Sequence, residues 1–346
     1  MKELLEFVVQ NDASDLHISS GLHPMVRISG DIEKIDVPQL SSDDVRVMVE
    51  YLTNEDQRKV FDETGDYDLS FQLGELARFR VNLFEQARGP GIVCRTIPTK
   101  ILSLAELKAP ASFATIASQP RGIVLVTGPT GSGKSTTLAA MIHEINCSKK
   151  EHILTVEDPI EFVHKPNQSL INQREVGAHT KSFASSLRAA LREDPDIILV
   201  GEMRDPETIG LALTAAETGH LVFGTLHTSS AAKTIDRVVD VFPAAEKEMI
   251  RAMLSESLRA VISQTLLKKV GGGRVAAHEI MIATPPIRNL IRENKVPQMY
   301  SAIQTGQQFG MQTLDQCLKK LVGDDMIANN EAMRVAVKKE DFREEK

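Results

Sequence analysis

The sequence contains no tryptophan, and only 4% of its residues are aromatic. Proteins that bind single-stranded nucleic acid without sequence preference stack the bases on aromatic side chains, so this chain has little material for such a surface. Its formal net charge is −7, whereas nucleic-acid-binding domains usually carry a basic face. We therefore expect no nucleic-acid partner.

Cysteine is also scarce, with three residues, Cys94, Cys147 and Cys317, and no Cys-x-x-Cys pair. This pattern predicts neither a zinc site nor a disulfide framework, and it fits a reduced, cytoplasmic setting. The sequence has no run of 18 uncharged apolar residues, and acidic residues stand where a signal peptide would be apolar. We expect no membrane span, so any membrane association would come through a partner.

With 346 residues and 42% hydrophobic content, the chain is long enough for two packed domains. We predict a mixed α+β domain over residues 1–98, a linker with one short helix over 99–118, and a second domain over 119–346. In the first domain, a helical pattern precedes strand-like segments. The helix is expected at Leu4, Leu5 and Val8, and the strands at 16–18, 25–28, 77–82 and 93–97, with Pro98 ending the last.

From Gly122 onward, apolar β-rich segments alternate with helical ones, which predicts a parallel sheet with helices on both faces. The expected strands are 123–127, 153–156, 197–200 and 221–225, and the expected helices start at Lys134 or span 183–191, 206–218 and 246–265. Asp205, Pro206 and Gly219 mark the two ends of the 206–218 helix. The charged residues 338–346 are expected to form a solvated, frayed end.

Each of the four predicted strands ends in polar residues. The first ends in a glycine-rich loop, the second in Glu157, the third in Glu202 and the fourth in His227. Because ligands gather at the carboxyl ends of parallel strands, we expect these four ends to form one site.

The loop after the first strand has all the residues of a phosphate-binding loop. It comprises Gly128, Pro129, Thr130, Gly131, Ser132, Gly133, Lys134 and Ser135, followed by Thr136. Its glycines let backbone N–H groups turn toward phosphates, and the following helix adds its positive N-terminal end. Lys134 is predicted to reach the β- and γ-phosphates, and the Ser135 hydroxyl to bind Mg²⁺. The chain is therefore predicted to bind ATP with Mg²⁺ and to hydrolyse it.

Two carboxylates are candidates for the remaining chemistry. Glu202 follows Ile197-Ile198-Leu199-Val200, as the acid of a Walker B strand does, and is predicted to bind Mg²⁺; a solvated acid is the alternative. Glu157 is expected one strand end away from the phosphates and is the favoured candidate to polarise the attacking water. Spacing alone leaves open which of the two is the base.

Histidines and arginines complete the candidate site. His227 is a candidate to contact the γ-phosphate or to relay its loss, whereas His220 could equally be structural. The two would face opposite sides of one strand, which disfavours a shared metal site. An arginine supplied in trans often meets the charge that develops on the transferred phosphoryl group. Arg80 and Arg95 are the candidates, with surface salt bridges as the alternative.

Four segments resemble the Walker A, Asp box, Walker B and His box motifs of the type II/type IV secretion ATPase superfamily. They are GPTGSGKSTT (128–137), ILTVEDPIEF (153–162), REDPDIILVGEMRD (192–205) and GHLVFGTLHT (219–228). The similarity runs from Ala13 to near Ile327. Within the superfamily the closest match is the type IV pilus retraction (PilT-type, twitching motility) ATPase. Residues 286–293, PIRNLIRE, are similar to its AIRNLIRE signature, with Pro286 in place of alanine.

The resemblance implies a PAS-like N-terminal domain, a RecA-like ATPase domain and a ring-shaped homohexamer. Each site would combine the P-loop of one subunit with arginines of a neighbour, and Arg80 and Arg95 match the family's arginine positions approximately. ATP turnover would change the angle between the domains around residues 99–118. That motion would act on an inner-membrane pilus platform protein from the cytoplasmic side and drive retraction, with a paralogous retraction ATPase as a further partner. In the 286–293 helix, Arg288 and Arg292 are expected to be exposed for a partner.

Three other functions stay open. A pilus-extension or type II secretion ATPase belongs to the same class, but such proteins usually carry paired Cys-x-x-Cys motifs, which this chain lacks. A RecA-like nucleic-acid translocase is disfavoured by the acidic charge and the scarcity of aromatic residues. A regulatory module that binds nucleotide without hydrolysing it would be expected to show decayed motifs, and here all four are intact.

Overall fold

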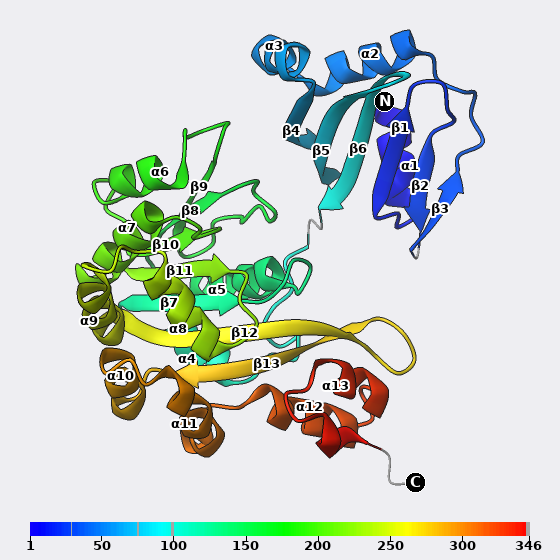
Figure 1. Ribbon diagram of the computed structural model, residues 1–346. Coiled ribbons are helices and arrows are strands. Elements are labelled where there is room, and N and C mark those ends of the chain that lie inside the picture. Colours follow the sequence, from blue (N-terminus) through cyan, green and yellow to red (C-terminus); the bar gives the residue numbers. More distant parts are fainter. Residues whose placement is uncertain (29, 75, 98–99, 344–346) are drawn as a thin grey trace. The chain divides into compact units, whose positions relative to one another are not determined.

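The computed structural model describes residues 1–28, 30–74, 76–97 and 100–343 (Figure 1). It divides into two compact units, Met1–Lys100 with Pro159–Val163, and Ile101–Asp158 with His164–Lys346. Each unit has its own hydrophobic core. None of the helices within the described ranges combines the length and the apolar character that crossing a lipid bilayer requires.

The first unit is a six-stranded antiparallel sheet in the order β3-β2-β1-β6-β5-β4. Its strands are β1 (Asp15–Ser19), β2 (Met25–Ile28), β3 (Asp31–Lys34), β4 (Asp66–Leu73), β5 (Ala77–Gln86) and β6 (Gly89–Ile97). Its helices are α1 (Lys2–Gln10), α2 (Ser42–Leu52) and α3 (Glu55–Thr64). All three helices share one core with alternate strand residues such as Phe79, Val81 and Leu83. The opposite face of the sheet therefore carries the polar residues of these strands, including Arg80.

The second unit is built on a seven-stranded sheet in the order β13-β12-β7-β11-β10-β8-β9, in which only β13 runs antiparallel to its neighbour. The strands are β7 (Gly122–Thr127), β8 (His152–Glu157), β9 (Leu170–Glu175), β10 (Ile197–Val200), β11 (Leu221–Leu226), β12 (Leu258–Lys268) and β13 (Arg274–Ile282). The helices are α4 (Ser112–Ala117), α5 (Lys134–Ser148), α6 (Phe183–Ala190), α7 (Pro206–Glu217), α8 (Ala231–Asp240), α9 (Lys247–Ser257), α10 (Pro285–Arg292), η1 (Val296–Gln298), α11 (Met299–Thr305), η2 (Gln307–Phe309), α12 (Leu314–Gly323), α13 (Asn329–Val335) and η3 (Lys339–Phe342).

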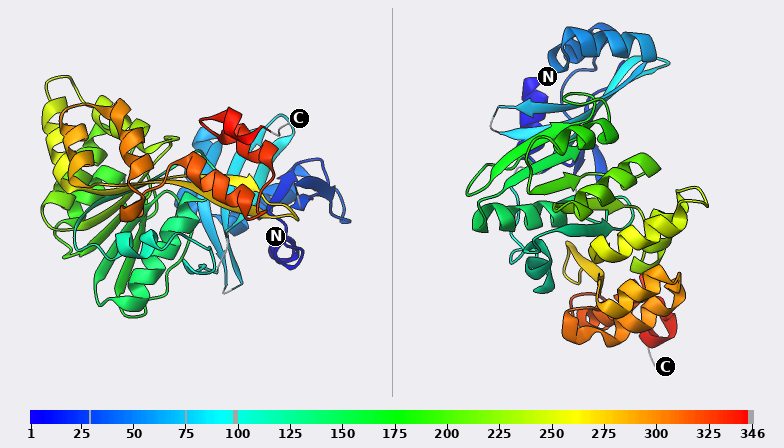
Figure 2. Two further views of the ribbon diagram at one scale, coloured as in Figure 1. Left: turned by 90° about the horizontal axis from the view of Figure 1, so that it is seen from below. Right: turned by 90° about the vertical axis from the view of Figure 1, so that its left-hand side faces the viewer.

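Helices cover both faces of this second sheet (Figure 1, Figure 2). On one face Ile123 and Leu125 of β7 share a core with α6 to α11, and on the other Val124 and Val126 share a core with α4 and α5. Strands buried on both faces read as continuous apolar runs, which is why 197–200 could be predicted to the residue. The predicted parallel sheet covered on both faces is confirmed.

The helix predicted over residues 246–265 is wrong in its second half. The chain is helical over Lys247–Ser257 and then becomes the long strand β12. β12 pairs with β7 on one side and β13 on the other, so most of its side chains are buried. A segment buried on both faces shows neither the strand nor the helix period, and tertiary pairing decides its structure.

The expectation of a frayed C-terminal end is also wrong in part. Residues 339–342 form the short helix η3, and Phe342 is buried in a small core with α12, α13 and the end of β12. Pro98, predicted to end a strand, lies outside the described residues; the strand itself ends at Ile97. The helices α2 and α3 were not expected, because their buried positions, such as Val45, Val49 and Phe61, are few and separated by charged residues.

Candidate nucleotide-binding site

The glycine-rich loop lies between β7, which ends at Thr127, and α5, which begins at Lys134. Gly128 has φ +144°, and a Cβ there would overlap the carbonyl oxygen of Gln264. Gly133 has φ +87° at the N-cap position of α5. Both positions therefore need glycine. Among the described residues no side chain caps α5, which leaves its first N–H groups available to an anion.

The predicted phosphate-binding residues all lie on this loop and the first turn of α5. The Nζ atom of Lys134 donates to the carbonyl oxygens of Gly128 (2.9 Å) and Pro129 (3.2 Å). Thr130 and Gly131 are exposed, Ser132 is buried, and Ser135 and Thr136 are half-buried. The loop and the first turn of α5 thus bring together backbone N–H groups, an ammonium group and a hydroxyl, which is the donor set that a nucleotide phosphate chain needs.

The four strand ends meet at one edge of the sheet, as expected from parallel strands. β7, β11, β10 and β8 are consecutive neighbours, and the register pairs Thr127 with Leu226, and Val200 with both Gly224 and Val156. The order of the ends is therefore P-loop, His227, Glu202, Glu157. The expectation that Glu157 lies one strand end from the P-loop is wrong, because β11 and β10 lie between β8 and β7. Crossover connections allow strands that are consecutive in sequence to be separated in the sheet.

Glu202 lies at the centre of a charged cluster on this edge. Its Oε1 atom is 2.6 Å from Nε2 of His227, and it forms an ion pair with Arg204. Burial raises the pKa of Glu202, but hydrogen bonds and charge from Arg204 and His227 outweigh this and leave that pKa below its usual value. Glu202 is therefore held as a carboxylate. Sequence reasoning did not single out Arg204, although it lies within the Walker B-like segment.

Glu157 has a different setting. Its Oε1 atom accepts hydrogen bonds from the Thr155 hydroxyl at 2.6 Å and from the Gln173 amide at 3.2 Å. It is half-buried. These two neutral donors fix one carboxylate oxygen and orient the side chain.

The two histidines flank β11 rather than lying in it, so the expectation about opposite faces of a strand does not apply. His220 lies at the amino end of β11, where its Nδ1 atom is 2.9 Å from the carbonyl oxygen of Ala215. That contact closes the turn after α7, at the edge of the sheet away from the P-loop, and indicates a structural role. Only His227 belongs to the edge with Glu202.

Arg80 and Arg95 lie directly opposite each other on β5 and β6 of the first unit, on the exposed face of the sheet. The Nε atom of Arg95 donates to Oδ1 of Asp15 at 2.8 Å, while Arg80 is 3.8 Å from Asp68. Burial raises the pKa of Asp15, but the hydrogen bonds from Arg95 and Ser14 and the charge of Arg95 keep that pKa below its usual value. Asp15 thus remains charged and holds Arg95 through one edge of its guanidinium group.

Comparison with known proteins identifies the family of the chain. Residues 1–334 match the family described as Type II/IV secretion system protein. The chain belongs to this family. It is 63% identical over 340 residues to the Type IV pilus retractation ATPase PilT of Pseudomonas aeruginosa, which covers 98% of this chain and 99% of that protein. It is also 64% identical over 314 residues to a twitching motility protein of Neisseria gonorrhoeae, covering 90% and 84%.

Among solved structures, the chain is similar to the pilus retraction motor PilT with bound ADP. The TM-score is 0.93, at 47% identity, with 99% of this chain and 98% of that chain covered. The predicted fold class, a RecA-like P-loop ATPase domain with a parallel-rich sheet preceded by a smaller PAS-like α+β domain, is confirmed. The predicted resemblance to pilus retraction ATPases is also confirmed, and this member of the secretion family is a nucleotide-binding ATP hydrolase.

Gln264 of β12 is a part of the site that sequence reasoning missed. It is 3% exposed; its amide nitrogen donates to the Ser132 carbonyl oxygen at 2.6 Å, and its amide oxygen accepts from the Thr137 hydroxyl at 2.8 Å. One buried side chain therefore ties the P-loop and the first turns of α5 to the central sheet. A glutamine within an apolar segment is the signal that was available, since buried amides usually have specific partners.

Proposed function

We propose that this chain is a motor ATPase that hydrolyses ATP to drive type IV pilus retraction. The observation that carries the proposal is the row of four adjacent strand ends, bearing the P-loop, His227, Glu202 and Glu157, in a chain that matches the Pseudomonas retraction ATPase from end to end. The absence of Cys-x-x-Cys pairs and the PIRNLIRE segment at 286–293 favour retraction over extension or type II secretion.

In this proposal Lys134 and the N–H groups at the start of α5 bind the phosphates of ATP. Mg²⁺ prefers oxygen ligands and usually takes only one or two from protein when phosphates supply others. The Ser135 hydroxyl and the Glu202 carboxylate fit that requirement, because both are oxygen donors and Glu202 is held ionised. A bound Mg²⁺ would neutralise charge on the phosphate oxygens.

We assign the general base to Glu157 and the metal-binding role to Glu202. A carboxylate whose pKa is lowered by Arg204 and His227 is a weak base, which disfavours Glu202. Glu157 lies at the neighbouring strand end, and hydrogen bonds from Thr155 and Gln173 orient its carboxylate. Glu157 would hold the attacking water and take its proton. His227, hydrogen-bonded to Glu202 and next to the P-loop strand, would transmit the loss of the γ-phosphate.

We further propose that the chain works as a homohexamer in which Arg80 and Arg95 complete the site of a neighbouring subunit. Both are exposed, on adjacent strands and in register, so both guanidinium groups lie on the same face of the sheet. As domains we propose residues 1–98 and 119–346, joined by a linker over 99–118 whose helix α4 packs on the second sheet. The ring would act at the cytoplasmic face of the inner membrane, through a pilus platform protein and alongside a paralogous retraction ATPase.

Mixed rings test the arginine assignment. Arg95→Ala and Lys134→Ala proteins are each expected to be inactive, but co-assembled at 1:1 they should recover activity at about a quarter of the interfaces, where an intact P-loop meets an intact arginine. Mixing Glu157→Gln with Lys134→Ala should give no recovery, because both residues belong to the same subunit's edge. Arg46→Ala, on α2, serves as the matched arginine control and should keep full activity. Absence of recovery in rings shown to be mixed by native mass spectrometry would refute the assignment.

The retraction proposal is tested by deleting the gene and counting surface pili by electron microscopy. A retraction motor predicts cells with excess pili that no longer twitch, because assembly continues without disassembly. Bald cells would instead identify an extension motor. Unchanged pili and motility would contradict both functions.

A further inference from the structure

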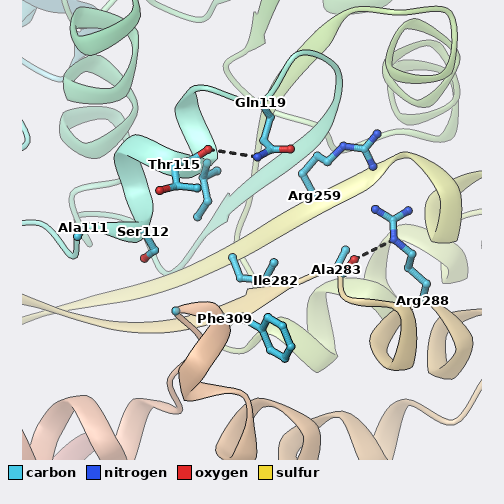
Figure 3. Close-up of a pocket in the computed structure, with 11 residues that line it drawn as sticks. Ala111, Ser112, Thr115, Gln119, Arg259, Ile282, Ala283, Arg288 and Phe309 are labelled. Atoms are coloured by element: carbon cyan, nitrogen blue, oxygen red, sulfur yellow. Dashed lines mark hydrogen bonds between the residues drawn. The ribbon is translucent and has the colours of Figure 1, made fainter.

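A pocket lies in the second unit, where β12 begins and β13 ends (Figure 3). Its volume is about 410 Å³, and its lining comes from α4, the start of β12, the end of β13, α10 and η2. Arg259, at its edge, donates to the carbonyl oxygen of Arg121, next to the amino end of β7. The pocket is therefore separate from the nucleotide site, which lies at the carboxyl end of the same strand.

Two arginines in the pocket wall are held rigidly by backbone carbonyl groups. Arg288 donates through Nε to Ala283 at 2.8 Å, through Nη1 to Ser255 and Glu256, and through Nη2 to Leu258. The prediction that Arg288 and Arg292 are both exposed for a partner is therefore wrong in part. Arg288 is half-buried, whereas Arg292 is exposed.

Arg259 is bound less completely than Arg288. It donates through Nε to Arg121 at 2.8 Å, and through Nη1 to Glu256 at 3.0 Å and Leu258 at 3.2 Å. A guanidinium group has five N–H donors. Within the part of the chain that the structure describes, the two donors of Arg259 Nη2 have no acceptor, so a fixed cation presents unused donors here.

Positive charge accumulates around this wall. Burial lowers the pKa of Arg259, and the nearby charges of Arg288 and Arg121 lower it further, with Glu256 opposing them. The Glu256 carboxylate is itself shared with Arg292, at 3.0 Å. The single carboxylate of Glu256 therefore does not balance the positive charge of the surrounding arginines. An anion bound between Arg259 and Arg288 would reduce the repulsion between these two side chains.

The rest of the lining is largely apolar. Ile116 is buried, Ile282 is half-buried, and Phe309 is 54% exposed, so about half of the Phe309 side chain is accessible. The side-chain amide nitrogen of Gln119, also in the lining, donates to the carbonyl oxygen of Thr115 at 3.3 Å. The Ser112 hydroxyl in the wall is buried without a hydrogen-bond partner among the described residues.

We propose that this pocket binds a small organic anion, in which a carboxylate contacts Arg259 and Arg288 and an apolar body of about the size of a phenyl ring packs on Ile282 and Phe309. An inorganic anion would leave the apolar wall exposed, and a neutral hydrocarbon would leave the arginine donors unused. The volume lies at the lower end of the range of small-molecule sites. This site is independent of the proposed retraction function.

The test titrates 3-phenylpropionate into the intact protein with ADP at saturation, so that the P-loop is occupied, and follows binding by ligand-observed NMR. We expect one saturable site per chain. The neutral 3-phenylpropan-1-ol lacks the carboxylate, and the small anion acetate lacks the phenyl ring. Each should therefore bind at least about tenfold more weakly. Equal binding of the alcohol would overturn the proposal, as would an absence of saturable binding of 3-phenylpropionate.

Variants locate the site. Phe309→Ala removes an exposed side chain and is expected to fold normally, and Arg259→Gln removes the unused donors; each should weaken 3-phenylpropionate binding about tenfold. Met249→Ala and Arg188→Gln, exposed residues outside the lining, are the matched controls and should bind as the parent chain does. If Arg259→Gln fails to fold, Phe309→Ala decides. Parent-like binding by Phe309→Ala would overturn the proposal.

Discussion

Replacing Lys134 with alanine is expected to lower kcat/KM for ATP hydrolysis by roughly 10²–10³-fold, the effect of removing one fixed donor from a developing negative charge. Lys134 lies over the loop, with Nζ bonded to the Gly128 and Pro129 carbonyl oxygens. From there it would reach the phosphates of a bound nucleotide by exchanging these carbonyl acceptors for phosphate oxygens. Phosphate release at several ATP concentrations measures the change.

The matched control for this variant is Lys320→Ala, an exposed lysine on α12 in the same unit. It should hydrolyse ATP at the parent rate. Circular dichroism establishes that Lys134→Ala is folded, since the loss of a half-buried lysine leaves the core unchanged. Normal ATP turnover by a folded Lys134→Ala protein would contradict the role of the P-loop in catalysis.

Replacing Glu157 with glutamine is expected to lower kcat by roughly 10²–10⁴-fold, the usual contribution of a general base, while ATP binding changes little. Glutamine keeps the size of glutamate, and its carbonyl oxygen can accept the hydrogen bond that the Thr155 hydroxyl donates to Glu157. It cannot take a proton from water. Single-turnover hydrolysis, combined with a direct measurement of ATP affinity, separates the chemical step from binding.

Glu202→Gln is the comparison that decides between the two carboxylates. Removing the charge that Arg204 and His227 hold in place should raise the Mg²⁺ concentration needed for half-maximal activity. Added Mg²⁺ should then restore part of the rate. If Glu202→Gln instead binds ATP and Mg²⁺ normally but hydrolyses slowly, and Glu157→Gln does not, the roles of the two residues are reversed.

Much of this edge of the sheet could be predicted, because parallel strands buried on both faces appear in the sequence as apolar segments. Ile197-Ile198-Leu199-Val200 is a continuous apolar run, and the polar Glu202 follows where the chain leaves the core. Largely apolar segments also mark the strands before Glu157 and His227, although each contains a threonine. Since all carboxyl ends of a parallel sheet lie at one edge, identifying the strands was enough to bring the residues together.

The order of the strands could not be predicted in the same way. Strand order depends on where each crossover connection packs against the sheet. No local feature of the sequence therefore indicates that β11 and β10 lie between the strand of Glu157 and the strand of the P-loop. Gln264 was missed for a related reason. It lies in β12, which pairs with β13 on one side and β7 on the other. The local sequence pattern favoured a helix through this segment, and strand pairing overrides that preference.

The central claim is that ATP hydrolysis at this strand edge drives pilus retraction. The most direct measurement follows fluorescently labelled pili in cells that lack other retraction ATPases and carry either the parent chain or Lys134→Ala as the sole copy. The account predicts retracting pili with the parent chain and pili that extend but never retract with the variant. Retraction at the parent rate in Lys134→Ala cells would contradict it.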